Sequence, residues 1–342
     1  MIVAFDTQLA VGTATGVGVY QRDLVSALRA GGTDVRALCA PWLDPWRFDR
    51  RLLWDQVLLP LAIARSGADL FHASAGTLPL LRRMPTVATV HDLAWLRVQA
   101  HTRGYARAYF GTLQARAYRG AAAIVCDSHF SATEYRALIE ADRTVDVVPP
   151  GVDERFARIE RAPDEAPFAL VVGTVETRKN LLAIIEALPA LRDLRVVSIG
   201  PFTPYAEQVR ARAAELGVGT RLELRGYVSP EERDALYARA ALALVPSRYE
   251  GFGYALAEAM CAGLPAIAAR AASLPELAGG AVPLVDPDDI PGWVAAIGSL
   301  LSDYHDAEAQ AAALRPAAIA SFSWRTAAER MLVVYARVAN AQ

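Results

Sequence analysis

The chain has 342 residues, of which 54% are hydrophobic and 21% charged, and its formal net charge is −2 at pH 7. This length exceeds one typical core and predicts two domains of about 150 residues each. The small net charge argues against a general nucleic-acid binder, and no apolar run approaches the ~20 residues that a membrane span needs.

The opening residues 1–6 are predicted to form a first strand and not a signal peptide. Three cysteines, Cys39, Cys126 and Cys261, are widely spaced, and each has apolar neighbours. This pattern favours reduced, buried thiols in a cytoplasmic protein over a disulfide framework or a zinc site.

Short apolar runs alternate with helical stretches in the N-terminal half. The predicted strands are residues 2–5, 35–38, 70–71, 86–90, 124–126 and 145–148. Helices are predicted at about residues 19–29, 54–66 and 103–118. This alternation predicts a parallel sheet with helices on both faces.

A loop of small residues containing Gly16, Val17 and Gly18 follows the first predicted strand. It does not fit a dinucleotide fingerprint, because the third glycine would fall on Gln21 and no acidic residue ends the second strand. A glycine loop at a helix N-terminus can still host a phosphate group.

His91 and Asp92 follow the strand at residues 86–90, and Ser128 follows the strand at 124–126. Ligands of open α/β sheets collect at this carboxyl edge, although a histidine there also fits a structural role. Ser128 is well placed to cap the next helix.

The segment from residue 93 to 126 contains arginines and aromatic residues but no Asp or Glu. Such a pattern is typical of a helix on an anionic bilayer surface, and it equally fits a solvated arginine-rich face. Its arginines are Arg97, Arg103, Arg107, Arg116 and Arg119.

The alternation stops at residues 149–151, and the charged, proline-bearing stretch to residue 167 is predicted to be an interdomain linker. The pattern then restarts as a second parallel sheet. Its predicted strands are residues 168–172, 195–199, 222–224, 241–245, 265–268 and 282–285. Its predicted helices are residues 181–191, 205–216, 230–239, 254–261 and 292–301, with a last helix at 323–339.

Two adjacent cations, Arg178 and Lys179, follow the strand at residues 168–172, and Lys179 is the only lysine of the chain. The helix dipole disfavours cations at a helix start unless an anion is bound. A compact ammonium also differs from a guanidinium in what it binds. The pair indicates a diphosphate site, with an exposed charged turn as the other interpretation.

Glu250 and Glu258 flank the start of the helix predicted at residues 254–261. Gly251 and Gly253 remove side chains from the intervening turn, so backbone N–H groups can approach an anion. Each glutamate alone is also explained by the helix dipole or by solvent exposure.

Together, these motifs resemble glycosyltransferase family 4, a group of retaining, nucleotide-sugar-dependent enzymes. The resemblance covers nearly the whole chain and continues through residues 274–276 and 322–324. It implies an α/β GT-B fold with two Rossmann-like, doubly wound domains facing a central cleft. Residues 1–160 would form the acceptor-side domain, residues 161–320 the nucleotide-sugar domain, and residues 321–342 a helix crossing back to the first domain.

The resemblance also implies site residues. The expected catalytic group is Glu250, which would contact the donor sugar, with His91, Arg178 and Lys179. The expected nucleotide- and substrate-binding residues are Gly16, Val17, Gly18, Thr174, Tyr227, Val228, Gly251, Phe252, Gly253 and Glu258. Some relatives carry an arginine where this chain has Thr174, and Arg178 is expected to supply that charge.

The implied reaction is the retaining, metal-independent transfer of a hexose, mannose from GDP-mannose, onto a glycan or a polyprenyl- or lipid-linked acceptor in bacterial polysaccharide or glycolipid synthesis. No cofactor, metal or nucleic acid is expected, and the five arginines above could contact the inner face of the plasma membrane.

The alternatives are a UDP- or dTDP-sugar-dependent enzyme of the same fold and a non-catalytic partner subunit that binds a sugar nucleotide. A phosphorylase would need a pyridoxal lysine, for which Lys179 is the only candidate. Asp286 and Asp288 form an Asp-x-Asp motif, for which helix capping is the preferred explanation.

Overall fold

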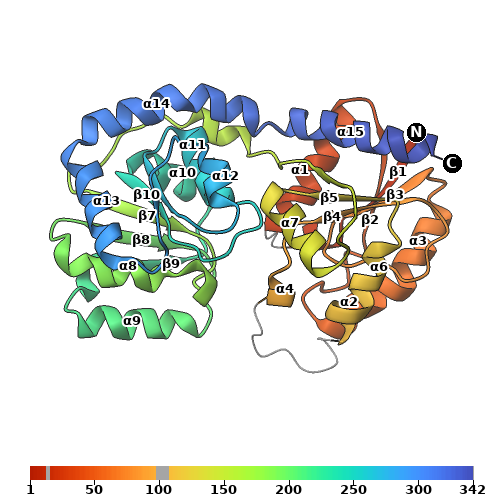
Figure 1. Ribbon diagram of the computed structural model, residues 1–342, viewed down its shortest axis with the longest axis horizontal. Coiled ribbons are helices and arrows are strands. Elements are labelled where there is room, and N and C mark those ends of the chain that lie inside the picture. Colours follow the sequence, from red (N-terminus) through yellow and green to blue (C-terminus); the bar gives the residue numbers. More distant parts are fainter. Residues whose placement is uncertain (13–15, 98–107, 342) are drawn as a thin grey trace. The chain divides into compact units, whose positions relative to one another are not determined.

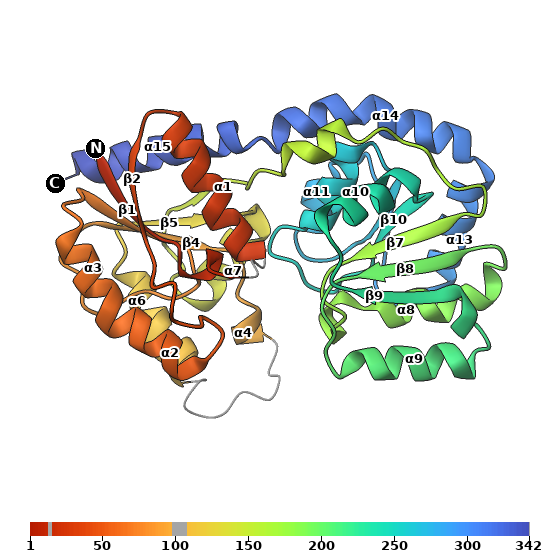
Figure 2. The same ribbon diagram turned by 180° about the vertical axis from the view of Figure 1, so that it is seen from behind.

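The computed structural model describes residues 1–12, 16–97 and 108–341. The chain divides into two compact units. Unit 1 comprises Met1–Gly151 and Ser323–Gln342, and unit 2 comprises Val152–Phe322. Each unit has a parallel sheet with helices on both faces (Figures 1 and 2).

The six strands of unit 1 lie in the order β2-β1-β3-β4-β5-β6, and all of their pairings are parallel. β3, β4 and β5 are buried at every position, which explains their largely apolar sequence. The strand order reverses between β1 and β3, which is the switch point where open α/β sheets bind ligands. The strands are β1 (Ile2–Asp6), β2 (Asp34–Leu38), β3 (Leu70–Ala73), β4 (Thr86–Val90), β5 (Ala123–Cys126) and β6 (Val145–Val147).

Helices cover both faces of this sheet. They are η1 (Gln8–Ala10), α1 (Gly16–Ala30), α2 (Phe48–Leu53), η2 (Trp54–Leu58), α3 (Leu59–Arg65), α4 (Ala94–Arg97), η3 (Ala108–Gln114), α6 (Ala115–Arg119), α7 (His129–Leu138) and α15 (Trp324–Asn340). Of these, η1 is a 3₁₀ turn, and η2 and η3 are π-helical.

The last helix, α15, packs on α1 within unit 1 (Figure 2). Its buried face includes Met331, Val334 and Tyr335, spaced three or four residues apart as an amphipathic helix requires. The Tyr335 hydroxyl lies 2.5 Å from Nδ1 of the buried His72 on β3, so a polar contact fixes the helix on the sheet.

The six strands of unit 2 lie in the order β12-β11-β10-β7-β8-β9, again with parallel pairings. The order reverses between β7 and β10, so the loops after these two strands flank the switch point. The strands are β7 (Phe168–Val172), β8 (Arg195–Ile199), β9 (Leu222–Gly226), β10 (Leu242–Val245), β11 (Ala266–Ala269) and β12 (Leu284–Val285).

In unit 2, α8 and α9 lie on one side of the sheet, and α10, α11 and α12 lie on the other (Figures 1 and 2). The helices are α8 (Leu181–Ala187), α9 (Tyr205–Glu215), α10 (Pro230–Arg239), α11 (Tyr254–Ala262), α12 (Leu274–Ala278), α13 (Ile290–Ser302) and α14 (Tyr304–Ser321). The 3₁₀ turns are η4 (Glu154–Arg158), η5 (Thr177–Lys179), η6 (Leu188–Ala190) and η7 (Gly219–Arg221).

The structure corrects several sequence-based expectations. Residues 152–167 are not a free linker, because Val152, Phe156 and Ile159 are buried in the core of unit 2. The unit boundary accordingly lies after Gly151, not at residue 160. Cys39 is exposed, whereas Cys126 and Cys261 are buried, because β2 is an edge strand with one open face.

One helix boundary and one whole helix also differ from the predictions. α1 begins at Gly16, so Gly16, Val17 and Gly18 lie in its first turn and not in a preceding loop. The N–H groups of a first helical turn have no partner within the helix, so they can approach an anion. The 18-residue helix α14, which carries Pro316 in its interior, was not predicted.

Candidate functional site

The two loops at the switch point of unit 2 bring opposite charges together. The β7 loop (residues 173–180) carries Arg178 and Lys179, and the β10 loop (residues 246–253) carries Glu250. Lys179 Nζ donates to Glu250 Oε1 at 2.5 Å, and Arg178 Nη1 lies 3.3 Å from Glu250 Oε2. Arg178 Nη1 also donates to the Tyr249 carbonyl at 3.1 Å, so the guanidinium bridges the two loops.

The charge of Glu250 is stabilised by these partners. Burial disfavours the carboxylate, but the charges and hydrogen bonds of Lys179 and Arg178, together with a hydrogen bond from Ser247, outweigh this effect and lower the pKa of Glu250. Glu250 is therefore an anion at neutral pH, although it is almost completely buried. Arg178 Nε also lies 2.8 Å from Glu176 Oε1, which fixes the guanidinium on a second side.

Two neighbouring residues hold the β10 loop in place. They are Ser273, which precedes α12, and Leu274, the first residue of α12. Ser273 Oγ bonds to the Glu250 carbonyl at 3.0 Å and to the Phe252 carbonyl at 2.7 Å. Gly253 has φ +105°, and a Cβ there would lie 2.8 Å from Leu274 Cδ2. The glycine is therefore required both by its backbone conformation and by the space available. α11 begins directly after it, so the residue at the N-cap position of this helix is a glycine, which has no side chain to cap the first turn.

Glycines stand at the ends of three neighbouring strands: Gly173 follows β7, Gly200 follows β8, and Gly226 is the last residue of β9. Gly173 and Gly200 each have φ +135°, and Gly226 has φ +69°. A Cβ on Gly200 would lie 2.2 Å from the Gly173 carbonyl oxygen, so the two strand ends approach each other backbone to backbone. The Lys179 side chain packs across Gly173, where a Cβ would lie 3.3 Å from its Cε. The signal in the sequence is a glycine directly after or at the end of each predicted strand.

Glu258 lies on α11 and contacts α10, not the Lys179 cluster. Its Oε2 accepts from Tyr237 OH at 2.6 Å and from Arg233 Nη2 at 2.5 Å. The sequence analysis missed both partners, because Tyr237 and Arg233 lie on another helix, 21 and 25 residues before Glu258 in the chain. Tyr227 and Val228 follow β9: the Tyr227 side chain is 67% exposed, and Val228 packs against the core.

The predicted histidine lies in unit 1, where the ends of three adjacent strands meet. His91 Nδ1 lies 2.7 Å from Asp127 Oδ2, and Nε2 lies 2.9 Å from the Ser74 carbonyl. Both partners are acceptors, so the ring satisfies both contacts when it carries two protons. Burial disfavours that charge, but Asp127, the Ser74 carbonyl and Asp92 together raise the pKa of His91 above its usual value.

The arginines of the segment from 93 to 126 are only partly open to a surface partner. Arg97 forms a bidentate pair with Glu134, and Arg119 Nε donates to the Ile139 carbonyl. Arg116 is exposed, and Arg103 and Arg107 lie outside the described residues. Among the described residues, no helix combines the length and the apolar character that are needed to cross a bilayer.

The Asp-x-Asp motif has structural roles in the described chain. Asp286 Oδ1 accepts from the backbone N–H of Asp288, and Asp288 pairs with Arg248. The residue that caps α13 is Asp289, whose Oδ1 accepts from Gly292 N at 2.9 Å. Capping is thus correct for the segment, but the capping residue is one position beyond the motif.

The cavities of unit 2 differ in size and place. A crevice of about 10 Å³, lined by Gly173, Thr174, Lys179 and Ser247, lies at the β7/β10 switch point. A larger cavity, of about 400 Å³, lies between α11, α13 and α14. It opens at the amino ends of β11 and β12, and no predicted site residue lines it. Parallel α/β sheets bind ligands at the opposite edge, so the small crevice is the functional candidate.

Comparison with known proteins identifies the family. The model of "Glycosyltransferase Family 4" matches residues 14–156, and that of "Glycosyl transferases group 1" matches residues 152–317. An MMP α-(1→4)-mannosyltransferase of Mycolicibacterium hassiacum is 29% identical over 73% of this chain and 65% of its own length. A D-inositol 3-phosphate glycosyltransferase of Xylanimonas cellulosilytica is 31% identical over 74% of this chain and 66% of its own length.

The chain thus spans just under two-thirds of each of these relatives. Among solved structures, a sucrose-phosphate synthase of Thermosynechococcus elongatus matches all of this chain and all of its own chain, with a TM-score of 0.82 at 21% identity. That likeness extends to the fold, with its two parallel six-stranded sheets. The chain therefore belongs to the group 1 glycosyltransferases of family 4 and has their α/β GT-B fold.

Proposed function

We propose that the protein is a retaining, metal-independent glycosyltransferase that moves a hexose from a nucleotide-sugar donor to a glycan or lipid-linked acceptor. The observation that carries this proposal is the convergence of Arg178, Lys179 and Glu250 at the switch point of unit 2. Two cations and a buried carboxylate at this edge match the needs of a donor that joins an anionic diphosphate to a neutral sugar.

We assign Arg178 and Lys179 to the donor diphosphate. Their charges would stabilise the negative charge that develops on the leaving nucleoside diphosphate, and the start of α11, with a glycine at its N-cap position, would contribute backbone N–H groups. Glu250 would hold the hydroxyls of the donor sugar and keep the two cations in place. Glu258 would hold the ribose, and Tyr227 and Val228 would flank the base.

The proposed reaction breaks the bond between the anomeric carbon and the leaving phosphate oxygen, and it forms a bond from that carbon to the acceptor oxygen. The acceptor proton passes to the leaving phosphate oxygen, so the new bond forms on the same face and the anomeric configuration is retained. Electrostatic stabilisation of the leaving group by fixed cations is the largest contribution expected from the protein. In unit 1, both ring N–H groups of His91 are already donated, to Asp127 and to the Ser74 carbonyl, so what His91 would offer a ligand is its positive charge.

GDP-mannose is the donor that we propose first, and the mannosyltransferase relative supports mannose as the sugar. A UDP- or dTDP-sugar is the second candidate, since the D-inositol 3-phosphate glycosyltransferase is equally similar and is not named a mannosyltransferase. The base is therefore the first quantity to measure.

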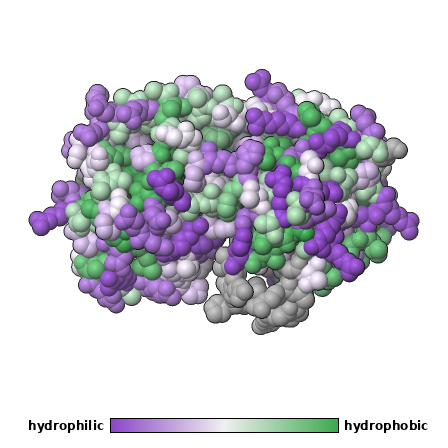
Figure 3. Space-filling view, in the orientation of Figure 1, coloured by the Kyte–Doolittle hydropathy of each residue, from purple (hydrophilic) through white to green (hydrophobic). Residues whose placement is uncertain are grey.

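We also propose that unit 1 contacts an anionic bilayer. Exposed apolar residues alone decide nothing, since both units show hydrophobic surface between polar patches (Figure 3). The support lies in their spacing. Leu53, Val57 and Leu61 recur every four residues on the continuous α2–η2–α3 helix, all are exposed, and Arg65 lies exposed at its end. Val57→Glu should weaken sedimentation with phosphatidylglycerol vesicles, whereas Val333→Glu on α15 should not.

The test of the donor site is a thermal-shift screen with GDP, UDP, ADP and dTDP, each with and without magnesium. A ligand that binds only the folded state stabilises it by about 2.7 kcal/mol at a hundredfold excess over its Kd. A magnesium-independent shift with one nucleotide, lost in Lys179→Ala, is the expected result. A chain that binds a nucleotide but releases no sugar from any donor would favour the non-catalytic subunit, and no shift at all would contradict the donor site.

A further inference from the structure

Unit 1 has a hollow of about 370 Å³ beside the carboxyl ends of β1 and β2. Small-molecule sites commonly have volumes of about 300–1,000 Å³. The wall on one side is Val11 and Gly12, from the loop after β1. The other walls come from the loop after β2 and from the start of α2, and they include Trp42, Asp44, Trp46 and Arg50.

Two indole rings line this hollow and face solvent. Trp42 is 76% exposed and Trp46 is 56% exposed. Each aromatic side chain can bury about 150–250 Å² in a core, at roughly 25 cal/mol per Å². Two tryptophans that stay in water four residues apart therefore give up most of the stabilisation that burial of such side chains supplies.

A buried clamp fixes the backbone that presents Trp42. The Gln8 side chain is fully buried and bonds to three backbone groups: its Nε2 donates to the Ala40 and Leu43 carbonyls at 3.2 and 2.9 Å, and its Oε1 accepts from Ala40 N at 2.7 Å. Leu43 N also donates to the Ala40 carbonyl at 2.9 Å. Trp42 therefore stands at the third position of a turn that is closed at both ends, and the turn cannot collapse inward.

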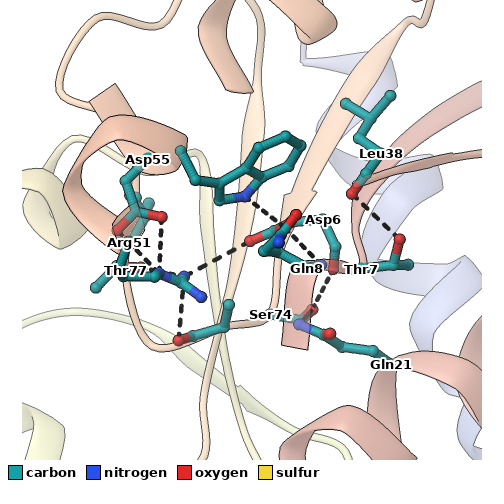
Figure 4. A network of polar contacts seen from close by, with 12 residues as sticks. Asp6, Thr7, Gln8, Gln21, Leu38, Arg51, Asp55, Ser74 and Thr77 are labelled. Carbon is teal, nitrogen blue, oxygen red and sulfur yellow. Dashed lines mark hydrogen bonds and ion pairs between the residues drawn. The ribbon is translucent and has the colours of Figure 1, made fainter. Parts of the chain in front are cut away.

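The clamp is itself part of a larger polar network at the end of β1 (Figure 4). Asp6 Oδ1 accepts from Gln8 N and from Trp54 Nε1, both at 3.1 Å. Arg51 of α2 lies between Asp55, Thr77 and Asp6, with Nε 2.9 Å from Asp55 Oδ1. Because Arg51 anchors α2 on the sheet, its neighbour Arg50 is held at the hollow.

We propose that this hollow binds a hexose ring of the acceptor, with Trp42 and Trp46 stacking on the ring and with Arg50 and Asp44 hydrogen-bonding to its hydroxyls. The C–H face of a hexose is apolar and weakly electropositive, and it therefore suits the electron-rich face of an indole. Charged side chains beside the rings supply the directional bonds that distinguish one sugar from another. This inference rests on the proposed function, since it names the chemistry of the acceptor.

The side chains around the hollow favour a sugar over a bilayer. Asp44 and Asp49 are exposed at the same segment, and Arg47 pairs with Asp49 at 3.0 Å. Anionic lipid headgroups repel such carboxylates, whereas carbohydrate hydroxyls accept and donate to carboxylates and guanidiniums alike. The segment therefore differs from the Leu53–Val57–Leu61 stripe that we assign to the membrane.

The first experiment is saturation-transfer NMR on the full chain with methyl α-D-mannopyranoside, methyl α-D-glucopyranoside and myo-inositol at millimolar concentrations. The wild-type chain should transfer saturation to the C–H protons of at least one probe. Trp42→Ala and Trp46→Ala should each reduce that signal several-fold, whereas Trp42→Phe should retain most of it. Val333→Ala, an exposed apolar residue on α15, is the matched control and should leave the signal unchanged.

The second measurement separates this hollow from the donor site. Trp42→Ala should raise the KM for a transfer acceptor roughly tenfold, with the thermal shift by nucleotide and the slow hydrolysis of the donor by water unchanged. If both alanine variants bound nucleotide and kept the wild-type acceptor KM and saturation transfer, the assignment of the hollow would be wrong. The proposed function would not be affected. If the two alanine variants lost binding to phosphatidylglycerol vesicles but kept the saturation-transfer signal of the sugars, the hollow would be a bilayer contact and the sugar site would be overturned. A wild-type chain that binds no nucleotide would instead overturn the proposed function.

Discussion

Lys179 Nζ lies 2.5 Å from Glu250 Oε1, so the only lysine of the chain is paired with a carboxylate 71 residues away. The pairing joins the loops on the two sides of a reversal in strand order. It keeps a cation and an anion charged inside a largely buried site, where each alone would be unfavourable.

Replacement of Glu250 should separate chemistry from binding. Glu250→Gln preserves the shape of the side chain but removes its charge, so transfer should fall by about a hundredfold or more, while nucleotide affinity changes only a few-fold. Turnover with saturating donor and calorimetric titration of the nucleoside diphosphate measure the two quantities. Glu207→Gln, at an exposed position on α9, is the control and should leave both quantities unchanged. Wild-type turnover by Glu250→Gln would contradict the assignment of the site.

Lysine and arginine should not be interchangeable at residue 179. The Lys179 chain packs across Gly173, where a Cβ would lie 3.3 Å from its Cε, so the bulkier guanidinium has little room. We expect both Lys179→Ala and Lys179→Arg to weaken nucleoside diphosphate binding about tenfold or more. Arg210→Lys on α9 should change nothing, and full affinity in Lys179→Arg would show that charge alone suffices.

The glycine contact between β7 and β8 should be intolerant of a side chain. In Gly200→Ala the new Cβ would lie 2.2 Å from the Gly173 carbonyl oxygen, at a φ of +135°. We expect a loss of at least about 3 kcal/mol, seen as a large fall in Tm or as failure to fold. Gly217→Ala is the matched control: its φ is +69° and nothing lies within 4 Å, so only about 1–2 kcal/mol of backbone strain applies. Equal effects of the two substitutions would contradict the close approach.

The protonation of His91 should depend on Asp127. The folded-state pKa of His91 is raised above its usual 6.5, so its charge contributes stability that is fully present below pH 6.5 and is lost as pH rises through the folded-state pKa. Asp127→Asn should lower that pKa and flatten the dependence of Tm on pH above 6.5. Ring-proton NMR across pH 5–9 measures the titration directly. A His91 pKa below 6.5 in the wild-type chain would contradict the two-acceptor geometry.

The amino-acid sequence by itself determined most of the secondary structure, and it singled out Arg178, Lys179 and Glu250, which the fold brings together. Each of the twelve predicted strands overlaps an observed strand, with ends within two residues, because buried parallel strands are short, continuous apolar runs. The Arg178–Lys179 pair and Glu250 were recognisable because charged residues flanked glycines at the ends of such runs. Local chemistry was sufficient for these features.

The tertiary structure decided what depends on contacts between distant segments. Only the strand order brings Lys179 to Glu250, the end of β8 to the end of β7, and His91 to Asp127. Burial of Val152, Phe156 and Ile159 likewise assigned to unit 2 a stretch whose local composition resembles a linker. The hollow at Trp42 and Trp46 is of the same kind, because two exposed tryptophans have no meaning in the sequence until a buried glutamine from another loop holds their turn in place.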